Sequence, residues 1–269
     1  MTISVIEPHG FCGGVARAIK MAHEALAHEA TGRIYCLHEI VHNEEVVQSL
    51  SAKGLRLVKR VEDVPPGAAV LISAHGTSPD VRAALADRGV RIIDATCPFV
   101  AAVHAKIQEN FRQGVRTVVV GKADHAEVRG YLGEPGACRP KDVRPGEVTA
   151  RVVQTTLDAG AHEGVCAAAR ERQRAVTAFV DAHREDKASV GLLVVGSMKS
   201  SNTNRLAEIA ARAGMPVWRM ASADEVAMAD FSGIEILGAT SGASTPESQF
   251  NEVLNAIARR SVAESDCGA

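Results

Sequence analysis

Three of the six cysteines stand in the same setting, directly before a stretch with the apolar spacing of an amphipathic helix. The stretches are "HGFCGGVARAIKMAHEAL", "DATCPFVAAVHAKIQENF" and "EGVCAAARERQRAVTAFV", and their cysteines are Cys12, Cys97 and Cys166. The unpaired N–H groups and the partial positive charge of a helix N-terminus stabilise a thiolate. These three thiols are therefore candidates for metal or redox chemistry, although a free cysteine is often only a small buried apolar residue.

Three thiolates can hold a zinc ion with an open fourth position, or an iron–sulfur cluster in which one iron lacks a protein ligand. Structural zinc sites usually bring their cysteines in close pairs such as C-x-x-C, and this sequence has no such pair. Ligands from three distant segments favour the cluster, but spacing leaves both metals open. Cys36 in an apolar run, Cys138 in a Gly/Pro-rich loop and Cys267 near the end are expected to be structural.

Polar side chains that can bind an anion follow several strand-like runs. "LHEIVHNEEV" carries His38 and His42, "ISAHGTS" carries His75, and "GKADHAEVRG" carries His125 and Glu127. In open α/β sheets, ligands bind outside the carboxyl ends of the strands. The loops "GSMKSSNTNR" and "SGASTPES" add hydroxyl and amide groups before helices, as anion sites do, although simple N-capping also uses them. Together these loops predict a phosphate or diphosphate site.

Short aliphatic runs alternate with helical patterns along the whole chain. We expect strands at 2–7, 33–37, 68–73, 90–94, 116–121, 150–154, 190–196, 216–220 and 235–239. We expect helices at 13–29, 43–53, 79–88, 98–113, 167–184, 203–213 and 246–260. This alternation predicts an α/β fold with parallel sheets covered by helices. The repeated cysteine setting predicts three similar lobes, 1–96, 97–188 and 189–269, with the strand in 1–12 joining the centre.

Bulk composition excludes several classes of function. Hydrophobic residues make up 46% and charged residues 23%, and the net charge of −2 gives no basic surface for nucleic acid. The chain has no apolar run of about 18 residues and no signal-like N-terminus, so we expect a cytoplasmic protein with no membrane contact. No Walker motif, no G-x-G-x-x-G and no G-x-S-x-G is present.

Eight stretches resemble the 4-hydroxy-3-methylbut-2-enyl diphosphate reductase family, the IspH/LytB enzymes of the methylerythritol phosphate route to isoprenoids. They are "GFCGGVARAI", "HEIVHN", "ISAHG", "DATCP", "HAEVRG", "VVQTTL", "GSMKSSNTNRLAEIA" and "SGASTPES". They occur in the family's order and extend over nearly the whole chain.

The resemblance implies a trefoil of three α/β lobes around a 4Fe–4S cluster, which oxygen can convert to a 3Fe–4S form. The implied cluster ligands are Cys12, Cys97 and Cys166. The implied diphosphate-binding residues are His42, His75, His125, Ser200, Ser201, Asn202 and Ser244. Glu127 and Thr155 match the pair that handles the allylic hydroxyl and its proton.

The implied reaction removes that hydroxyl reductively and gives isopentenyl and dimethylallyl diphosphate. Hydroxide is a poor leaving group, so a proton donor and a Lewis-acidic iron are both expected. Because the chain shows no flavin or nicotinamide motif, its electrons are expected from a ferredoxin- or flavodoxin-like partner.

The chain departs from the family's pattern in several places. His9 stands where the family usually has arginine, and Ala126 stands where it has proline. The segment "DAGAHEGV" before Cys166 is about one helix shorter than in the family, which leaves Cys138 as a remote substitute ligand. Two alternatives therefore remain: a diverged paralogue that reduces another phosphorylated allylic alcohol, and a non-catalytic cluster-binding redox sensor. Retention of Glu127 and Thr155 argues against the sensor.

Overall fold

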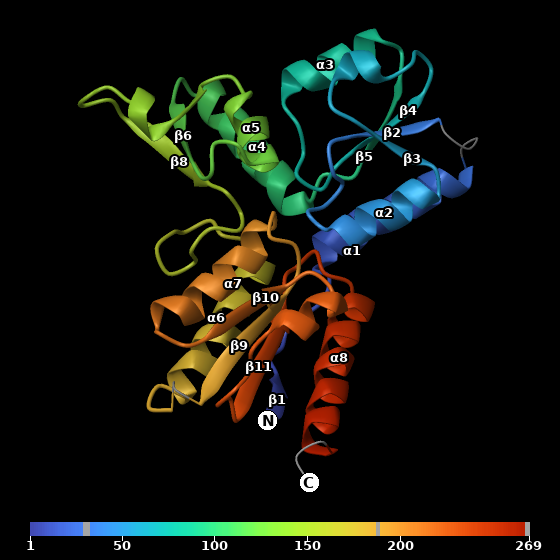
Figure 1. The fold of residues 1–269 in the computed structure, drawn as a ribbon. Helices are drawn as coiled ribbons and strands as arrows, with labels where there is room; N and C mark the ends of the chain where they lie inside the picture. The colour runs from blue at the N-terminus through green and yellow to red at the C-terminus, as the bar shows by residue number, and fades with distance from the viewer. Residues whose placement is uncertain (29–32, 187–188, 267–269) are drawn as a thin grey trace. The chain divides into compact units, whose positions relative to one another are not determined.

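The structure is a computed structural model that describes residues 1–28, 33–186 and 189–266, so Cys267 lies outside the described residues. The chain divides into two compact units, one of Met1–Cys12 with Ala167–Ala269 and one of Gly13–Cys166. The first unit holds one parallel sheet and the second holds two. Helices flank all three sheets (Figure 1).

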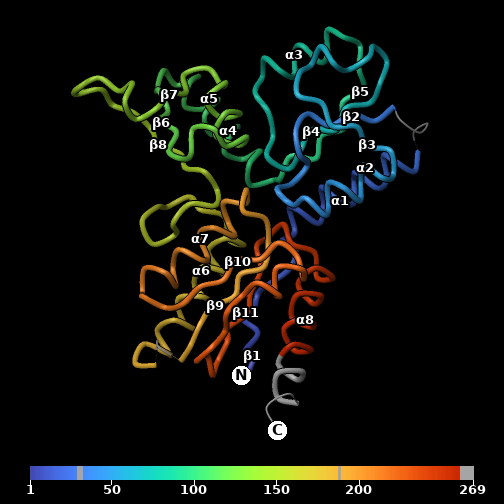
Figure 2. The backbone as a smooth tube through the Cα atoms, viewed as in Figure 1, coloured from blue at the N-terminus to red at the C-terminus, as the bar shows by residue number. Residues whose placement is uncertain are grey.

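The sheet of the first unit has the strand order β1 (Thr2–Val5), β11 (Ile236–Ser241), β9 (Val190–Val195), β10 (Val217–Met220). The two ends of the chain thus meet in one sheet, because β1 pairs with β11 (Figure 2). Alternate residues of β9 point to opposite faces. Leu192 and Val194 pack with α6 (Ala167–Ala182) and α7 (Ser201–Arg212), while Leu193 and Val195 pack with α8 (Glu247–Asp266). Helices on both faces explain why this strand is a continuous apolar run.

The first sheet of the second unit has the order β3 (Leu55–Val58), β2 (Ile34–Leu37), β4 (Ala69–Ile72), β5 (Arg91–Asp94). Helix α3 (Pro79–Asp87) lies on one side of it, and α1 (Gly13–His28) and α2 (Glu44–Ala52) lie on the other (Figure 1). The side chain of Asn43 caps α2 and that of Ser78 caps α3, each accepting a backbone N–H of the first turn.

The second sheet of this unit has the order β7 (Ala137–Cys138), β6 (Arg116–Val120), β8 (Thr149–Val153). Helices α4 (Pro98–Arg112) and α5 (Ala126–Leu132) pack on it through an aliphatic cluster that also contains Tyr131. Short 3-10 helices occur at Val61–Asp63, Pro140–Asp142 and Ala223–Met228. No helix among the described residues is long and apolar enough to cross a membrane.

The predicted α/β class with parallel sheets is confirmed, and each predicted strand and helix is present within two residues of its expected ends, except that α8 extends six residues beyond the expected end at 260. The last residue of the predicted helix 13–29 lies outside the described residues. Besides the three short 3-10 helices, the elements of the described residues that were not predicted are the short strands β3 and β7 and the seven-residue helix α5. The lobe boundaries at 96/97 and 188/189 stay a prediction.

Candidate active site

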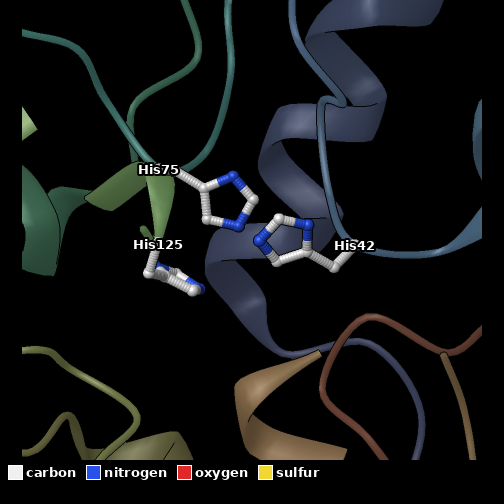
Figure 3. Close-up of side chains that lie close together, drawn as sticks. All are labelled: His42, His75 and His125. Atoms are coloured by element: carbon white, nitrogen blue, oxygen red, sulfur yellow. The ribbon is translucent and has the colours of Figure 1, made fainter. Parts of the chain in front are cut away.

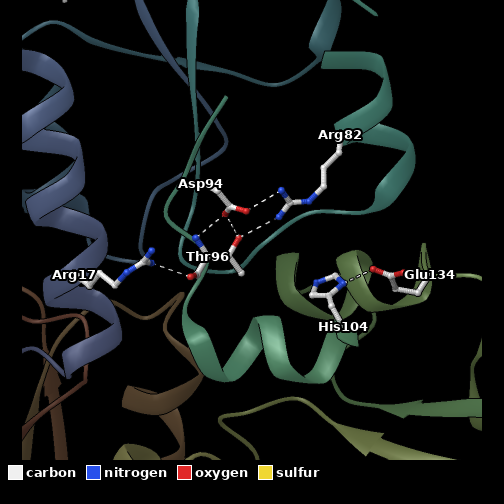
Figure 4. Close-up of polar contacts among 6 residues, drawn as sticks. All are labelled: Arg17, Arg82, Asp94, Thr96, His104 and Glu134. Carbon is white, nitrogen blue, oxygen red and sulfur yellow. Dashed lines mark hydrogen bonds and ion pairs between the residues drawn. The ribbon is translucent and has the colours of Figure 1, made fainter. Parts of the chain in front are cut away.

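A polar network holds the "DATCP" turn that leads into α4 (Figure 4). Asp94 ends β5, and one of its carboxylate oxygens accepts the Thr96 N–H at 2.9 Å. The other carboxylate oxygen accepts from Arg82 of α3 at 2.8 Å, and Arg17 of α1 donates to the Thr96 carbonyl at 3.0 Å. Side chains from two helices thereby fix the backbone just before the cysteine.

Cys97 is the N-cap residue of α4 and is followed by Pro98, which favours a helix start. Its backbone N–H donates to the Ala74 carbonyl at 3.0 Å, so the cysteine turn is tied to the residue before His75. The Cys97 side chain makes no capping hydrogen bond with the helix. The thiol is therefore positioned by its backbone and is not used to cap α4.

Cys166 directly precedes α6, and its N–H donates to the Thr155 carbonyl at 3.0 Å. The short segment 156–165 contains no helix, yet it returns the chain so that Cys166 lies beside Thr155. Burial raises the pKa of Tyr131 far above its usual range, and the nearby Glu127, Cys97 and Cys166 act in the same direction. Both candidate cysteines of this unit, Cys97 and Cys166, thus lie within electrostatic reach of one buried side chain.

Cys12 directly precedes α1, and its N–H donates to the Ala243 carbonyl at 3.1 Å. The preceding loop is anchored at Gly10, whose N–H donates to the Ser241 hydroxyl at 2.8 Å. The buried guanidinium of Arg172 on α6 donates to the Gly10 carbonyl at 2.9 Å. All three candidate cysteines therefore sit where the sequence placed them, at helix starts whose backbone is well held.

Solvent exposure separates the cysteines into two groups. No described cysteine forms a disulfide, and the three candidates Cys12, Cys97 and Cys166 are partly exposed. Cys36 and Cys138 are buried in strands, and the Cys138 thiol donates to the Thr117 carbonyl at 3.6 Å. The structure thus gives Cys138 a partner within its own sheet, as expected of a structural residue. The donor set that remains, three accessible thiols, fits an iron–sulfur cluster or a zinc ion.

Three histidines of the second unit converge (Figure 3). The rings of His42 and His75 stack with centroids 4.3 Å apart, and His125 meets both edge-on at 5.1 and 5.4 Å. One nitrogen of each ring lies within 4.8 Å of the others. Among the described residues, no other group of three or more His, Cys, Asp or Glu side chains brings its ligand atoms this close together. The buried Nδ1 of His75 has no hydrogen-bond partner there. Such a cluster can hold a metal ion, or donate three N–H groups to one anion.

Local contacts set the orientation of these rings. His125 caps α5 by accepting the Glu127 N–H on Nδ1 at 3.3 Å, which leaves the proton of the neutral ring on Nε2. His42 Nδ1 lies 3.3 Å from a carboxylate oxygen of Glu39. His75 is followed by Gly76, whose φ of +71° a side chain would strain.

Burial lowers the pKa of His75 well below its usual value, and charge on His42 or His125 would lower it further. Burial likewise lowers the pKa of His125 to about 4, again with a contribution from His42. Both rings are therefore neutral near pH 7. A neutral imidazole binds phosphate oxygens as a hydrogen-bond donor, without a formal charge.

Glu127 and Thr155, which the family resemblance pairs, lie in direct contact. Glu127 Oε1 accepts the Thr155 N–H at 2.6 Å, and Oε2 lies 3.0 Å from Thr155 Oγ1. Only 2% of Glu127 is exposed, and burial raises its pKa to about 7 against the hydrogen bonds from Thr155 and Tyr131 that lower it. A carboxyl group with this pKa is present in both protonation states at neutral pH, which suits a general acid.

The hydroxyl and amide groups of the first unit occupy the start of α7 and the loop after β11. Ser200 caps α7 by accepting the Thr203 N–H at 3.3 Å, and Ser201 and Asn202 are buried in its first turn. Ser244 is buried in the loop between β11 and α8. Neither amide atom of Asn202 has a hydrogen-bond partner in the described residues. Because buried polar groups are normally paired, this amide indicates a ligand site.

The second unit also has a cavity of about 290 Å³, which begins beside the clustered histidines at Gly76 and Ala126. Its walls include Lys59, Arg129 and Ser78, but none of the three clustered histidines and neither Glu127 nor Thr155. The supporting residues that the sequence did not reveal are Tyr131 and Arg172. Their spacing in the chain carries no motif.

A buried acid paired with a hydroxyl, and partly exposed thiols at helix starts, are the chemical groups of an α/β enzyme. The family model described as "LytB protein" matches residues 3–163 and 141–258. The chain belongs to the LytB protein family.

Curated relatives support this assignment over most of their length. A protein of Pectobacterium atrosepticum is 35% identical over 289 aligned positions, covering 96% of this chain and 89% of the relative. One of Pseudomonas syringae pv. tomato is 37% identical, covering 92% of this chain and 87% of the relative. Both are named 4-hydroxy-3-methylbut-2-enyl diphosphate reductase.

Two solved structures share the fold. The E-1-hydroxy-2-methyl-but-2-enyl-4-diphosphate reductase of Plasmodium falciparum is 28% identical, with a TM-score of 0.87 over 94% of this chain and 87% of that one. A second structure, of (E)-4-hydroxy-3-methyl-but-2-enyl diphosphate reductase, is 29% identical, with a TM-score of 0.66 over 96% of this chain and 100% of that one.

Proposed function

We propose that this protein removes the allylic hydroxyl of 4-hydroxy-3-methylbut-2-enyl diphosphate and yields isopentenyl and dimethylallyl diphosphate. The observation that carries this proposal is the buried Glu127–Thr155 pair, because its carboxyl group keeps a transferable proton near pH 7. The names of the curated relatives support the choice of substrate.

The overall reaction consumes two electrons and two protons. One proton joins the departing hydroxyl to form water, and the other joins one end of the allylic system. Hydroxide is a poor leaving group, so the first proton must arrive as the C–O bond breaks. In the proposed arrangement, Thr155 Oγ1 donates to the substrate oxygen and is reprotonated by Glu127 Oε2.

The diphosphate is the second part of the proposed recognition. His42, His75 and His125 present three ring nitrogens that can donate hydrogen bonds to phosphate oxygens. The proposal also includes the groups of the first unit that match the family's diphosphate contacts: Ser200, Ser201, Asn202 and Ser244.

The proposed cofactor is a 4Fe–4S cluster bound by Cys12, Cys97 and Cys166. Bound there, it would supply the two electrons singly and a Lewis-acidic iron for the hydroxyl oxygen. The proposed electron donor is a ferredoxin- or flavodoxin-like protein.

Anaerobic purification with iron and sulfide analysis, followed by substrate and a chemical reductant, tests the function. We expect four irons per chain and turnover of about 1 per second or more. A loaded cluster without turnover of this substrate would favour reduction of another phosphorylated allylic alcohol. Protein with no iron after anaerobic reconstitution would contradict the proposal.

Replacing Asn202 by alanine should weaken substrate binding without weakening the fold. The Asn202 amide has no hydrogen-bond partner among the described residues, so its removal leaves no protein group newly unpaired. We expect KM to rise about tenfold, since one lost hydrogen bond is about 1 to 1.5 kcal/mol, with an unchanged or higher Tm. Steady-state kinetics and thermal unfolding measure the two effects.

Ser78→Ala is the control, because the Ser78 side chain caps another helix, α3, and is not among the proposed binding residues, so KM should not change. Loss of this cap should cost about 1 kcal/mol of stability and lower the Tm. An Asn202→Ala protein with normal KM and a lowered Tm would show that the amide is structural.

A further inference from the structure

Tyr131 lies one helical turn after Glu127 on α5, so the two side chains share a face of the helix. The Tyr131 hydroxyl donates to Glu127 Oε1 at 3.1 Å, and the ring is completely buried. The sequence motifs assign this tyrosine no role. Its hydroxyl is nevertheless in direct contact with the proposed proton donor.

The lone pairs of the carboxyl group decide where its proton can reside. Oε1 accepts two hydrogen bonds, from the Thr155 N–H at 2.6 Å and from Tyr131 at 3.1 Å. An sp² carboxyl oxygen has two lone pairs, so both are occupied. Oε2 has one described partner, Thr155 Oγ1 at 3.0 Å, and a hydroxyl can accept as well as donate.

We propose that Tyr131 is a positioning residue that confines the Glu127 proton to Oε2, from which it can pass only to Thr155 Oγ1. Without the tyrosine hydroxyl, one lone pair of Oε1 is released. This inference rests on the proposed function, because it specifies the direction in which the Glu127–Thr155 pair delivers its proton.

The tyrosine ring packs against His104, whose own ring is paired with Glu134 (Figure 4 shows the His104–Glu134 pair). His104 of α4 meets the ring edge-on, with centroids 4.9 Å apart, and His104 Nδ1 lies 2.6 Å from Glu134 Oε1. Gln108 donates to the other Glu134 oxygen at 3.0 Å. The hydroxyl therefore has little freedom to turn away from Glu127.

Several titratable groups surround the Glu127–Tyr131 contact. Glu127 itself shares α5 with Tyr131, His104 faces the tyrosine from α4, and Cys97 and Cys166 act on its hydroxyl. Tyr131→Phe leaves all of these side chains in place and removes only the oxygen atom. Any change in the titration of Glu127 in Tyr131→Phe can therefore be attributed to the missing hydroxyl.

Infrared difference spectroscopy of the holoenzyme between pH 5 and pH 9 tests the proposal without turnover. The band of the protonated Glu127 carbonyl is identified by its absence in Glu127→Gln. With the proton on Oε2, the C=O bond is at Oε1, so loss of the tyrosine donor in Tyr131→Phe should move the band to higher wavenumber. The titration midpoint of the band should rise by about one pH unit, since one hydrogen bond to the charged form is lost.

Activity gives a second measurement. The alkaline limb of the kcat profile reports loss of the Glu127 proton, so Tyr131→Phe should move this limb to higher pH by the same amount. KM should stay within about twofold, because the substrate contacts are intact. A purely structural role for Tyr131 would lower Tm and leave both the limb and the band unchanged.

The other tyrosine of the chain supplies the control. Tyr35 is buried in the first sheet of the second unit, among residues that do not contact Glu127, so Tyr35→Phe should leave the band in place. In that variant Tyr131 is the sole tyrosine, and 3-fluorotyrosine incorporated during growth labels it alone. The phenol of 3-fluorotyrosine is more acidic and donates a stronger hydrogen bond, so the Glu127 carbonyl band should move to lower wavenumber. This measurement tests the proposal even if Tyr131→Phe does not fold.

An unmoved band in both the phenylalanine and the fluorotyrosine proteins would overturn the proposal. Failure of the proposed function would look different. If the band shifts as expected but the protein does not turn over the substrate, the proposed role of Tyr131 stands. Only the proposed substrate is then wrong.

Discussion

Glu127→Gln should remove most turnover while leaving the protein folded and the proposed cluster intact. General acids contribute about 10² to 10⁴ in rate, so kcat is expected to fall by that factor. Visible absorption and iron content should equal those of the wild type. Single-turnover product analysis measures the loss, and unchanged turnover would exclude Glu127 as the proton donor.

Glutamine reproduces the hydrogen bonds of the protonated acid. Its carbonyl oxygen can occupy the Oε1 position, where Thr155 N–H and Tyr131 donate, and its amide can donate to Thr155 Oγ1 from the Oε2 position. The variant therefore preserves the contacts and lacks only the transferable proton. A loss of rate in a correctly folded variant would then be a chemical effect.

The wild type should become less stable than Glu127→Gln as the pH rises. Burial raises the folded-state pKa of Glu127 to about 7, whereas an unfolded glutamate has a pKa of about 4.3. The stability that this protonated group contributes is fully present below about pH 4.3 and is lost as pH rises through about 7. At pH 8 the glutamine variant should be more stable by up to roughly 3 kcal/mol, and near pH 4 the difference should vanish. Equal stability at pH 8 would contradict the raised pKa.

The sequence predicts the sheet pattern well because its strands are buried on both faces. Runs such as "AAVLIS" and "VGLLVVG" are continuous apolar segments between helical patterns, which few other structures produce. Strand β3 was not predicted, because "LRLV" is short and has two exposed residues, so it is not a buried apolar run. Helix α5 was not predicted because its seven residues contain no full apolar repeat and include a glycine.

The pairing of Glu127 with Thr155 depends on topology that spacing does not reveal. Glu127 lies on α5, which follows β6, and Thr155 follows β8. These strands are parallel neighbours in the order β7, β6, β8, so their carboxyl ends lie at one edge of the sheet. Motif resemblance named both residues, but only the strand order explains why their side chains meet. The same holds for Tyr131, which belongs to no motif and is placed by the helix that periodicity missed.

Cys97→Ser should lose most of its iron and at least about 100-fold in turnover, since even outer-shell partners of metal ligands carry effects of 10- to 100-fold. Cys166→Ser should do the same, which tests the ligand that follows the shortened segment. Cys138→Ser is the control: its hydroxyl can still donate to Thr117, so iron and turnover should be unchanged with a cost of about 1 kcal/mol. Iron loss in Cys138→Ser but not in Cys166→Ser would require a different ligand set.

The Cys97 substitution is informative because serine should not harm the local fold. Cys97 is the N-cap of α4 and makes no capping bond with its side chain, whereas serine is among the preferred N-cap residues. The backbone before it is held by Asp94 and Arg82, which the substitution does not touch. The iron-free variant should therefore unfold at the same temperature as iron-free wild type, or higher. Loss of iron together with an undiminished Tm could then arise only from the missing thiolate, because the turn that carries it would still be formed.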